Sequence, residues 1–186
     1  MKRFSRQVKI GDRVIGGGAP ILVQSMLNAP ADDFNKNLEQ LTALQDAGCE
    51  IVRMAIPDAN AVTVLGKLKE CAKVPLVADI HFDYKLALES LEAGVDKIRI
   101  NPGNIGSFDR VEKVANACAA KKVPIRIGVN SGSVEKDLLA KYGGATPEAM
   151  AESAFRHISL LEKCGFYDTV VSIKSSDVTK MVKAYT

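Results

Sequence analysis

Residues 96–106 read DKIRINPGNIG, and this stretch contains the pattern on which the fold depends. In its first half polar and apolar residues alternate, so Lys97, Arg99 and Asn101 share one face of a strand while Ile98 and Ile100 share the other. The proline and glycines that follow interrupt the strand and predict a loop with free backbone N–H groups. A strand that presents a guanidinium and an amide toward such a loop is suited to holding an anion.

The same kind of unit recurs along the chain. Each unit has a short strand rich in β-branched residues, a loop, and a longer segment with apolar residues at helical spacing. Gly48, Gly94 and Gly165 mark the ends of helices, and Ser107 and Thr146 are expected to cap the beginnings of two others. Strands are predicted at residues 21–26, 51–55, 76–80, 97–101, 125–129 and 169–174.

The strand faces favour a barrel over a doubly wound sheet. Parallel strands covered on both faces usually read as continuous apolar runs, whereas here one face of most strands is polar. Polar groups at successive strand ends suit one site at the C-terminal mouth of a barrel. The sequence therefore predicts an α/β fold, a TIM-type (β/α)8 barrel that is incomplete because only six βα units are present.

The N-terminal segment has a different pattern. Two short alternating runs flank Gly11 and Asp12, which predicts a β-hairpin with a two-residue turn. We therefore expect an N-terminal hairpin and lead-in over residues 1–19 and the partial barrel over residues 20–186.

Composition excludes several classes of protein. The chain has 186 residues, 47% hydrophobic and 25% charged, which is enough for one globular unit with a core. A net charge of +3 and an aromatic content of 5% argue against nucleic-acid binding. The basic N-terminus precedes no apolar segment, and no stretch approaches the roughly 20 apolar residues of a membrane span. We expect a cytoplasmic protein that binds neither nucleic acid nor a membrane.

The repeated basic residues predict an anionic ligand. Arg53, Arg99 and Arg126 share one face of neighbouring strands, together with a lysine, and would repel one another unless an anion lies among them. The planar fork of arginine suits phosphate or carboxylate, and three arginines suit more than one negative charge, which favours a diphosphate. Asn101 and Asn130 can add neutral hydrogen bonds.

Asp79 and His81 lie two residues apart at the end of a predicted strand. Two roles are open for Asp79: a direct catalytic role, or neutralisation of a neighbouring arginine. His81 is expected to contact the ligand because it lies on the same face at a strand end. The other histidine, His157, lies in a predicted helix and is expected to be structural or exposed.

The four cysteines, Cys49, Cys71, Cys118 and Cys164, stand singly. None shows the short Cys-x-x-Cys spacing of a metal or redox pair, so we expect small buried side chains and no metal site in this chain.

Four segments together resemble a known family. ADIHF at residues 78–82, DKIRINPGNIG at 96–106, IRIGVNSGS at 125–133 and SIKSSD at 172–177 are similar to successive strand-end motifs of 4-hydroxy-3-methylbut-2-enyl diphosphate synthase. The resemblance covers essentially the whole chain and implies a barrel that binds 2-C-methyl-D-erythritol 2,4-cyclodiphosphate in the non-mevalonate pathway of isoprenoid biosynthesis. Family members are oxidoreductases that open this cyclic diphosphate to hydroxymethylbutenyl diphosphate with a [4Fe-4S] cluster and electrons from ferredoxin or flavodoxin.

Position by position, the resemblance implies roles for residues of this chain. The diphosphate-binding arginines match Arg53, Arg99 and Arg126, with Asn130 and Lys174 beside them. Asn101 and Ser176 match further substrate-binding positions, and Asp79 and His81 match mouth positions that are candidates for catalysis. Ser131 and Ser175 stand where the family commonly has alanine.

The resemblance places the cluster elsewhere. In the family three cysteines and a glutamate of a C-terminal iron–sulfur domain hold it, and none of the cysteines here matches those ligands. We therefore expect this chain alone to bind substrate without turning it over, and a stoichiometric [4Fe-4S] cluster in it would contradict that expectation. The family also forms a head-to-tail homodimer in which the cluster domain of one subunit caps the barrel of the other.

Two alternatives are open at this point. One is another phosphate-binding barrel enzyme, such as a synthase that uses a pterin diphosphate, which a preference for a pterin substrate would reveal. The other is a non-enzymatic diphosphate-binding module. A parent reading frame that continues into a cysteine-bearing segment would argue against the module.

Overall fold

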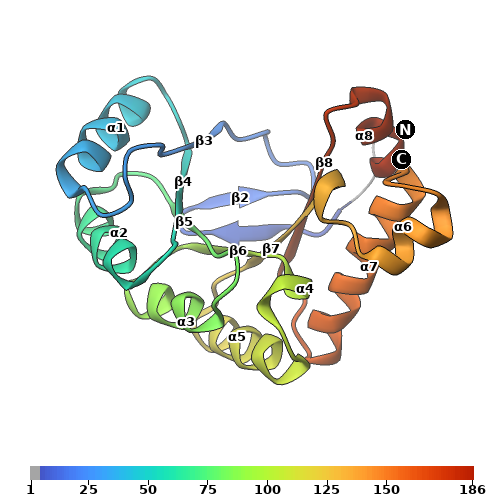
Figure 1. Cartoon of the computed structure of the whole chain (residues 1–186). Coiled ribbons are helices and arrows are strands. Elements are labelled where there is room, and N and C mark those ends of the chain that lie inside the picture. The colour runs from blue at the N-terminus through green and yellow to red at the C-terminus, as the bar shows by residue number, and fades with distance from the viewer. Residues whose placement is uncertain (1–4) are drawn as a thin grey trace.

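The computed structural model describes residues 5–186, apart from the side chain of Pro102, and it has the predicted barrel topology. Six parallel strands lie side by side in sequence order and form a curled sheet. Figure 1 shows the helices in an arc along the outside of this sheet, with the hairpin on its inner side. The strands are β3 (Gln24–Met26), β4 (Ile51–Ala55), β5 (Leu76–Asp79), β6 (Lys97–Ile100), β7 (Ile125–Asn130) and β8 (Thr169–Lys174).

Each strand is followed by helical structure. The bounds are α1 (Phe34–Asp46), α2 (Ala59–Cys71), α3 (Tyr84–Glu92), α4 (Pro102–Ile105), α5 (Phe108–Lys121), η1 (Ser131–Ser133), α6 (Lys136–Tyr142), α7 (Pro147–Lys163) and α8 (Val178–Tyr185). Thr146 caps α7 as predicted, because its hydroxyl accepts a hydrogen bond from the N–H of Ala149 at 3.2 Å. Ser107 occupies the N-cap position of α5, but its side chain makes no capping hydrogen bond; its carbonyl accepts from Arg110 N instead.

The core lies between the sheet and the helices. The outward-facing residues of β6 and β7, such as Ile98, Ile100, Ile125 and Ile127, are fully buried against this layer. The opposite parity of the same strands faces the inside of the curl and carries Lys97, Arg99 and Arg126. The period of two in the sequence therefore separates the core from the lumen of the barrel.

The hairpin closes one end of the lumen. β1 (Val8–Ile10) and β2 (Arg13–Ile15) pair antiparallel around the predicted Gly11-Asp12 turn. Ile10 is fully buried and packs with Ile51 and Val77, which lie near the N-terminal ends of β4 and β5. The hairpin is thus a plug at the end of the barrel opposite the predicted mouth. Residues 1–4 of the predicted lead-in lie outside the described residues.

Two elements differ from the sequence prediction. The first barrel strand covers Gln24–Met26 rather than residues 21–26, because pairing with β4 begins at the Gln24–Ile51 register. Ile21 is accordingly 98% exposed. Residues 102–105, predicted as a loop of free N–H groups, form the short helix α4: Gly103 N donates to Asn101 Oδ1 at 3.1 Å and Asn104 N to Asn101 O at 2.9 Å.

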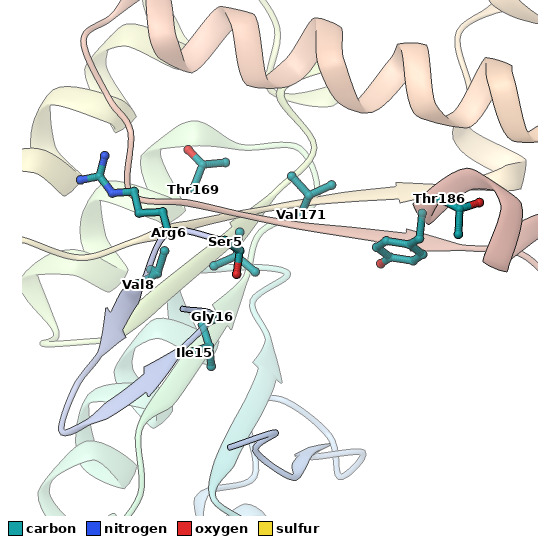
Figure 2. Close-up of a pocket in the computed structure, with 10 residues that line it drawn as sticks. Ser5, Arg6, Val8, Ile15, Gly16, Thr169, Val171 and Thr186 are labelled. Carbon is teal, nitrogen blue, oxygen red and sulfur yellow. The ribbon is translucent and has the colours of Figure 1, made fainter. Parts of the chain in front are cut away.

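β8 forms one edge of the sheet, and a cavity of about 750 Å³ lies beside it. Figure 2 shows residues that line this cavity: Arg6, Val8 and Ile15 come from the hairpin region, and Thr169 and Val171 come from β8, with their side chains pointing away from the hairpin. Tyr185 also lines it and accepts a hydrogen bond from the backbone N–H of Ile173 at 2.6 Å. Within residues 5–186, no helix combines the length and apolar character needed to cross a membrane.

Candidate functional site

The polar lumen face ends in a cavity at the carboxyl ends of the strands. Its volume is about 270 Å³. Side chains from β3 to β8 and from the loops that follow them converge there, as the parity of the strands predicts. The cavity is lined by Met26, Arg53, Asp79, His81, Phe82, Arg99, Asn101, Asn104, Asn130, Ser133 and Lys174.

Asp79 is the hub of this arrangement. Its side chain is 4% exposed, and its Oδ1 accepts a hydrogen bond from Arg99 Nη1 at 2.9 Å. Its Oδ2 lies 3.5 Å from Arg53 Nε and 3.6 Å from His81 Nε2. The structure therefore supports the neutralising role that was open for Asp79, and it also places the carboxylate next to His81.

Positive charge exceeds negative charge on the lumen face. Arg126 lies below the cavity, where its Nε donates to Ser172 Oγ at 3.0 Å. Burial lowers the pKa of Arg126, and the nearby charges of Arg53 and Arg99 lower it further. The pKa of Lys174 is lowered by the same causes, first burial and then the neighbouring arginines. Cations that disfavour one another's charge form a site that a multiply charged anion would stabilise.

Gly128 gives Arg99 its position, and the sequence analysis did not single it out. Arg99 Nη2 donates to the carbonyl oxygen of Gly128 at 3.3 Å. A Cβ at position 128 would lie 2.5 Å from Arg99 Nε and 2.7 Å from Nη2. The available signal was a glycine inside a strand, which often marks a close approach by another group.

The two asparagines lie at the rim as predicted, within structured loops. Asn101 lines the cavity, while its Oδ1 also caps α4. Asn130 also lines it, and Ser133 fixes the loop by accepting from Asn130 N at 3.3 Å and donating to Asn130 O at 3.2 Å. Ser176, in contrast, lies exposed between β8 and α8 and does not line this cavity.

His157 is buried, which resolves the choice between a structural and an exposed residue. Its Nε2 lies 3.2 Å from Glu135 Oε1, in the segment after β7. On its other side it packs against Gly103 of α4, since a Cβ at position 103 would lie 3.0 Å from His157 Cε1. Burial lowers the pKa of His157, although the Glu135 carboxylate opposes this shift. One side chain thus contacts both loops that carry the rim asparagines.

The cysteines do not fit an iron–sulfur cluster. Cys49 and Cys118 are buried, Cys164 is half-buried and Cys71 is exposed. Burial raises the pKa of Cys118 to about 12, which disfavours the thiolate that a metal requires. Across the described part of the chain, no group of three or more His, Cys, Asp or Glu side chains is placed to hold a metal ion.

A curled parallel sheet with helices outside and a cationic mouth at its carboxyl end defines a barrel of the TIM class. A comparison with protein families identifies the family to which this barrel belongs. The model described as the GcpE TIM-barrel domain matches residues 5–186, and the chain belongs to this family. The family predicted from the four strand-end motifs is therefore confirmed.

Curated relatives carry one enzyme name. A protein of Caldanaerobacter subterraneus subsp. tengcongensis is 52% identical over 185 residues, and one of Maridesulfovibrio salexigens is 54% identical over 184 residues. Both are called 4-hydroxy-3-methylbut-2-en-1-yl diphosphate synthase (flavodoxin). The alignments cover 100% and 99% of this chain but 52% and 51% of the relatives. The chain therefore spans about half the length of the curated relatives it matches.

Solved structures of other enzymes share the fold. A dihydropteroate synthase from Xanthomonas albilineans, in complex with 7,8-dihydropteroate, superposes with a TM-score of 0.64 at 14% identity and covers 96% of this chain and 70% of its own. A truncated 3-deoxy-D-arabino-heptulosonate 7-phosphate synthase from Thermotoga maritima gives 0.64 at 15% identity, covering 92% and 58%. At these identities the likeness supports the barrel architecture alone.

Proposed function

We propose that this chain is the substrate-binding barrel portion of a 4-hydroxy-3-methylbut-2-enyl diphosphate synthase. Its ligand is 2-C-methyl-D-erythritol 2,4-cyclodiphosphate, an intermediate of isoprenoid biosynthesis. The observation that carries the proposal is the set of arginines on β4, β6 and β7 around the single carboxylate of Asp79. The names of the relatives give a diphosphate as the product, which agrees with a diphosphate ligand, and the cyclodiphosphate is the substrate that the family resemblance implies.

The residues of this chain bind and orient the diphosphate. The guanidinium of Arg99 is held by hydrogen bonds to the Asp79 carboxylate and to the carbonyl oxygen of Gly128. Arg53 lies close to the Asp79 carboxylate from the neighbouring strand β4. Arg126 adds positive charge from below, and Lys174 adds it at the rim. Asn101 and Asn130 supply neutral hydrogen bonds at the mouth, and Ser176 stays a candidate that must move inward to take part. Oriented guanidinium groups of this kind hold phosphate oxygens by paired hydrogen bonds.

We assign proton handling to His81. Its imidazole is 46% exposed, lines the cavity and lies 3.6 Å from the Asp79 carboxylate. An imidazole at the mouth of the cavity can pass a proton between solvent and a bound ligand. His81 is therefore suited to deliver a proton to a ligand oxygen at the mouth.

The reducing chemistry belongs to a part of the enzyme outside this chain. In the complete enzyme a [4Fe-4S] cluster would supply reducing electrons, and flavodoxin, the donor in the relatives' names, would be their source. Because the cysteines of this chain do not fit the cluster, we place it in the portion of the parent that the chain does not span. We accordingly propose that this chain binds the diphosphate without turning it over, and that the parent is a homodimer.

Calorimetric titration with the cyclodiphosphate at low and moderate salt tests the proposal. We expect micromolar affinity that weakens as salt screens the guanidinium charges. Arg99→Ala and Arg126→Ala should each reduce the binding free energy by about 2 kcal/mol or more, the scale for losing a desolvated charge contact. Arg6→Ala is the matched control, because Arg6 is exposed and pairs with Asp168 away from the mouth.

Each contrary result has a defined meaning. A folded chain that fails to bind the cyclodiphosphate would contradict the proposal. Equal losses in all three arginine variants would show that binding depends on overall charge and not on the mouth. Tighter binding of a pterin diphosphate would favour the alternative barrel enzyme, for which the shared fold alone gives no support.

A further inference from the structure

Lys97 is a buried lysine on the inward face of β6, two residues before Arg99. It lies near the beginning of β6, opposite Val77 of β5, and is 3% exposed. Its Nζ donates a hydrogen bond to Gln24 Oε1 at 3.2 Å. This partner is a neutral amide, so the hydrogen bond does not compensate the charge of an ammonium group.

The charged groups around Lys97 are mainly cationic. Arg53 of β4 and Arg126 of β7 both act on it, and Arg99 lies two residues further along its own strand. On the inward faces of the described strands, the one acidic side chain is Asp79, which already contacts Arg99, Arg53 and His81. The hairpin face that carries Ile10 also carries Arg13, which lies 3.7 Å from its own partner Asp12.

Such surroundings favour the neutral amine. Burial, followed by the charges of Arg126 and Arg53, lowers the pKa of Lys97 to about 7. Near neutral pH the ligand-free site therefore holds Lys97 partly as an amine and partly as an ammonium group. A negatively charged ligand among the arginines would favour the ammonium form of Lys97, because it supplies the counter-charge that this form lacks.

We infer that Lys97 takes up a proton from solvent when a phosphate-bearing anion binds at the mouth. Lys97 thereby acts as a further binding residue, one that adds a positive charge only when the ligand is present. The inference rests on the proposed diphosphate-binding function and adds a specific proton linkage to it. Affinity should fall as the pH rises above about 7, by up to tenfold for each pH unit over the range in which free and bound sites differ in protonation.

Calorimetry in buffers with different ionisation enthalpies measures this proton directly. The cyclodiphosphate is a suitable probe because each of its phosphorus atoms carries one strongly acidic oxygen, so the ligand itself does not titrate near neutral pH. At pH 7.5 we expect roughly 0.7 proton taken up for each anion bound by the unmodified chain. Lys97→Met, which keeps the length of the side chain without its amine, should reduce the uptake to near zero.

His81 is the control for a competing source of the same signal. It also lines the mouth and carries an imidazole, so His81→Asn should leave most of the proton uptake in place if Lys97 is responsible. Uptake that survives Lys97→Met and disappears in His81→Asn would overturn the inference. Binding without any proton uptake would overturn it as well, while leaving the proposed function intact.

A measurement on the unmodified, ligand-free chain tests the inference even if the Lys97→Met variant misfolds. The side-chain resonances of Lys97, assigned by isotope labelling, should titrate with a midpoint near 7 and shift upward by more than one pH unit when the cyclodiphosphate is added. A midpoint close to the ordinary lysine value of 10.5 would refute the inference without reference to any ligand. A folded chain that binds no cyclodiphosphate would refute both the linkage and the proposed function.

Discussion

Gly128 lies against the guanidinium of Arg99, so closely that a Cβ at position 128 would stand 2.5 Å from Arg99 Nε. In Gly128→Ala the flexible end of Arg99 must move, and it then loses its place beside Asp79. We expect diphosphate affinity to fall about tenfold or more, equivalent to ~1.4 kcal/mol, and the free energy of unfolding to fall by about 1–3 kcal/mol, because the added methyl group crowds a buried site. Calorimetry and urea denaturation measure the two quantities.

Gly132→Ala is the matched control for this substitution. Gly132 lies in η1 close to the mouth, but a Cβ there would meet no atom within 4 Å. It should leave both affinity and stability almost unchanged. If Gly128→Ala and Gly132→Ala bind the diphosphate equally well, close contact with Gly128 is not what positions Arg99.

The ion pairs formed by Asp79 and Asp168 have the same length but differ in burial, so they allow a buried ion pair to be compared with an exposed one. Each carboxylate lies 2.9 Å from an arginine, but Asp79 is 4% exposed and Asp168 is 53% exposed. Asp79→Asn leaves buried arginines without a counter-charge and should lower the free energy of unfolding by about 3–5 kcal/mol. Asp168→Asn should cost about 1 kcal/mol or less. Comparable losses in urea denaturation would contradict the central role of Asp79.

Lys97 should make stability depend on pH in an unusual direction. Because its pKa is about 7 in the fold and about 10.5 in the unfolded chain, the unfolded state binds more protons between these values, so stability rises with pH across that window. Lys97→Met removes this contribution. The variant should exceed the unmodified chain in stability by on the order of 3–5 kcal/mol at pH 6, and the gain should shrink as the pH approaches 10.

Denaturation of both proteins at several pH values measures this difference. His157 also has a lowered pKa, but its effect belongs to lower pH, below its ordinary value of 6.5, and is common to both proteins. A stability difference that does not vary between pH 6 and pH 10 would show that Lys97 is not held as an amine in the fold.

His157 should couple the two loops at the mouth. It contacts Glu135 after β7 and Gly103 after β6, so His157→Gln removes the imidazole that meets Glu135 and loosens both contacts. We expect a loss of about 1–3 kcal/mol in stability and a joint loss of hydrogen-exchange protection over residues 101–106 and 130–135. Arg156→Gln, which affects the exposed Asp137 and the half-buried Glu152, should leave these loops protected. Loss confined to one loop would argue against coupling.

The strand period explains how much of the site the sequence could predict. Once the strands are parallel and adjacent, residues of one parity must converge inside the curl, which places Arg53, Asp79, Arg99 and Arg126 together. The order of strands and the hairpin follow from equally local signals, the alternation of strands with helices and the Gly11-Asp12 turn.

The remaining details depend on contacts between segments distant in sequence. The role of Gly128 becomes visible only when the register with β6 brings Arg99 over it. From the sequence, His157 is a single histidine in a predicted helix and could be buried or exposed. Its partners Glu135 and Gly103 come from two other segments, so the sequence pattern does not reveal them. Helix α6 was not predicted because its seven residues are too few for a helical period to stand out. Asn101 shows a third cause, since one side chain both caps a helix and lines the mouth.

The hairpin blocks one end of the barrel along its axis. With Ile10 seated against Ile51 and Val77, a ligand held by Arg99 and Arg126 meets solvent along the axis on one side only. Under the proposed function, a group that approaches along the axis would therefore reach that ligand from the same end of the barrel as the ligand itself. The sheet itself stays open at its two edge strands, β3 and β8, within the described residues, so the hairpin restricts access along the axis and not from the side.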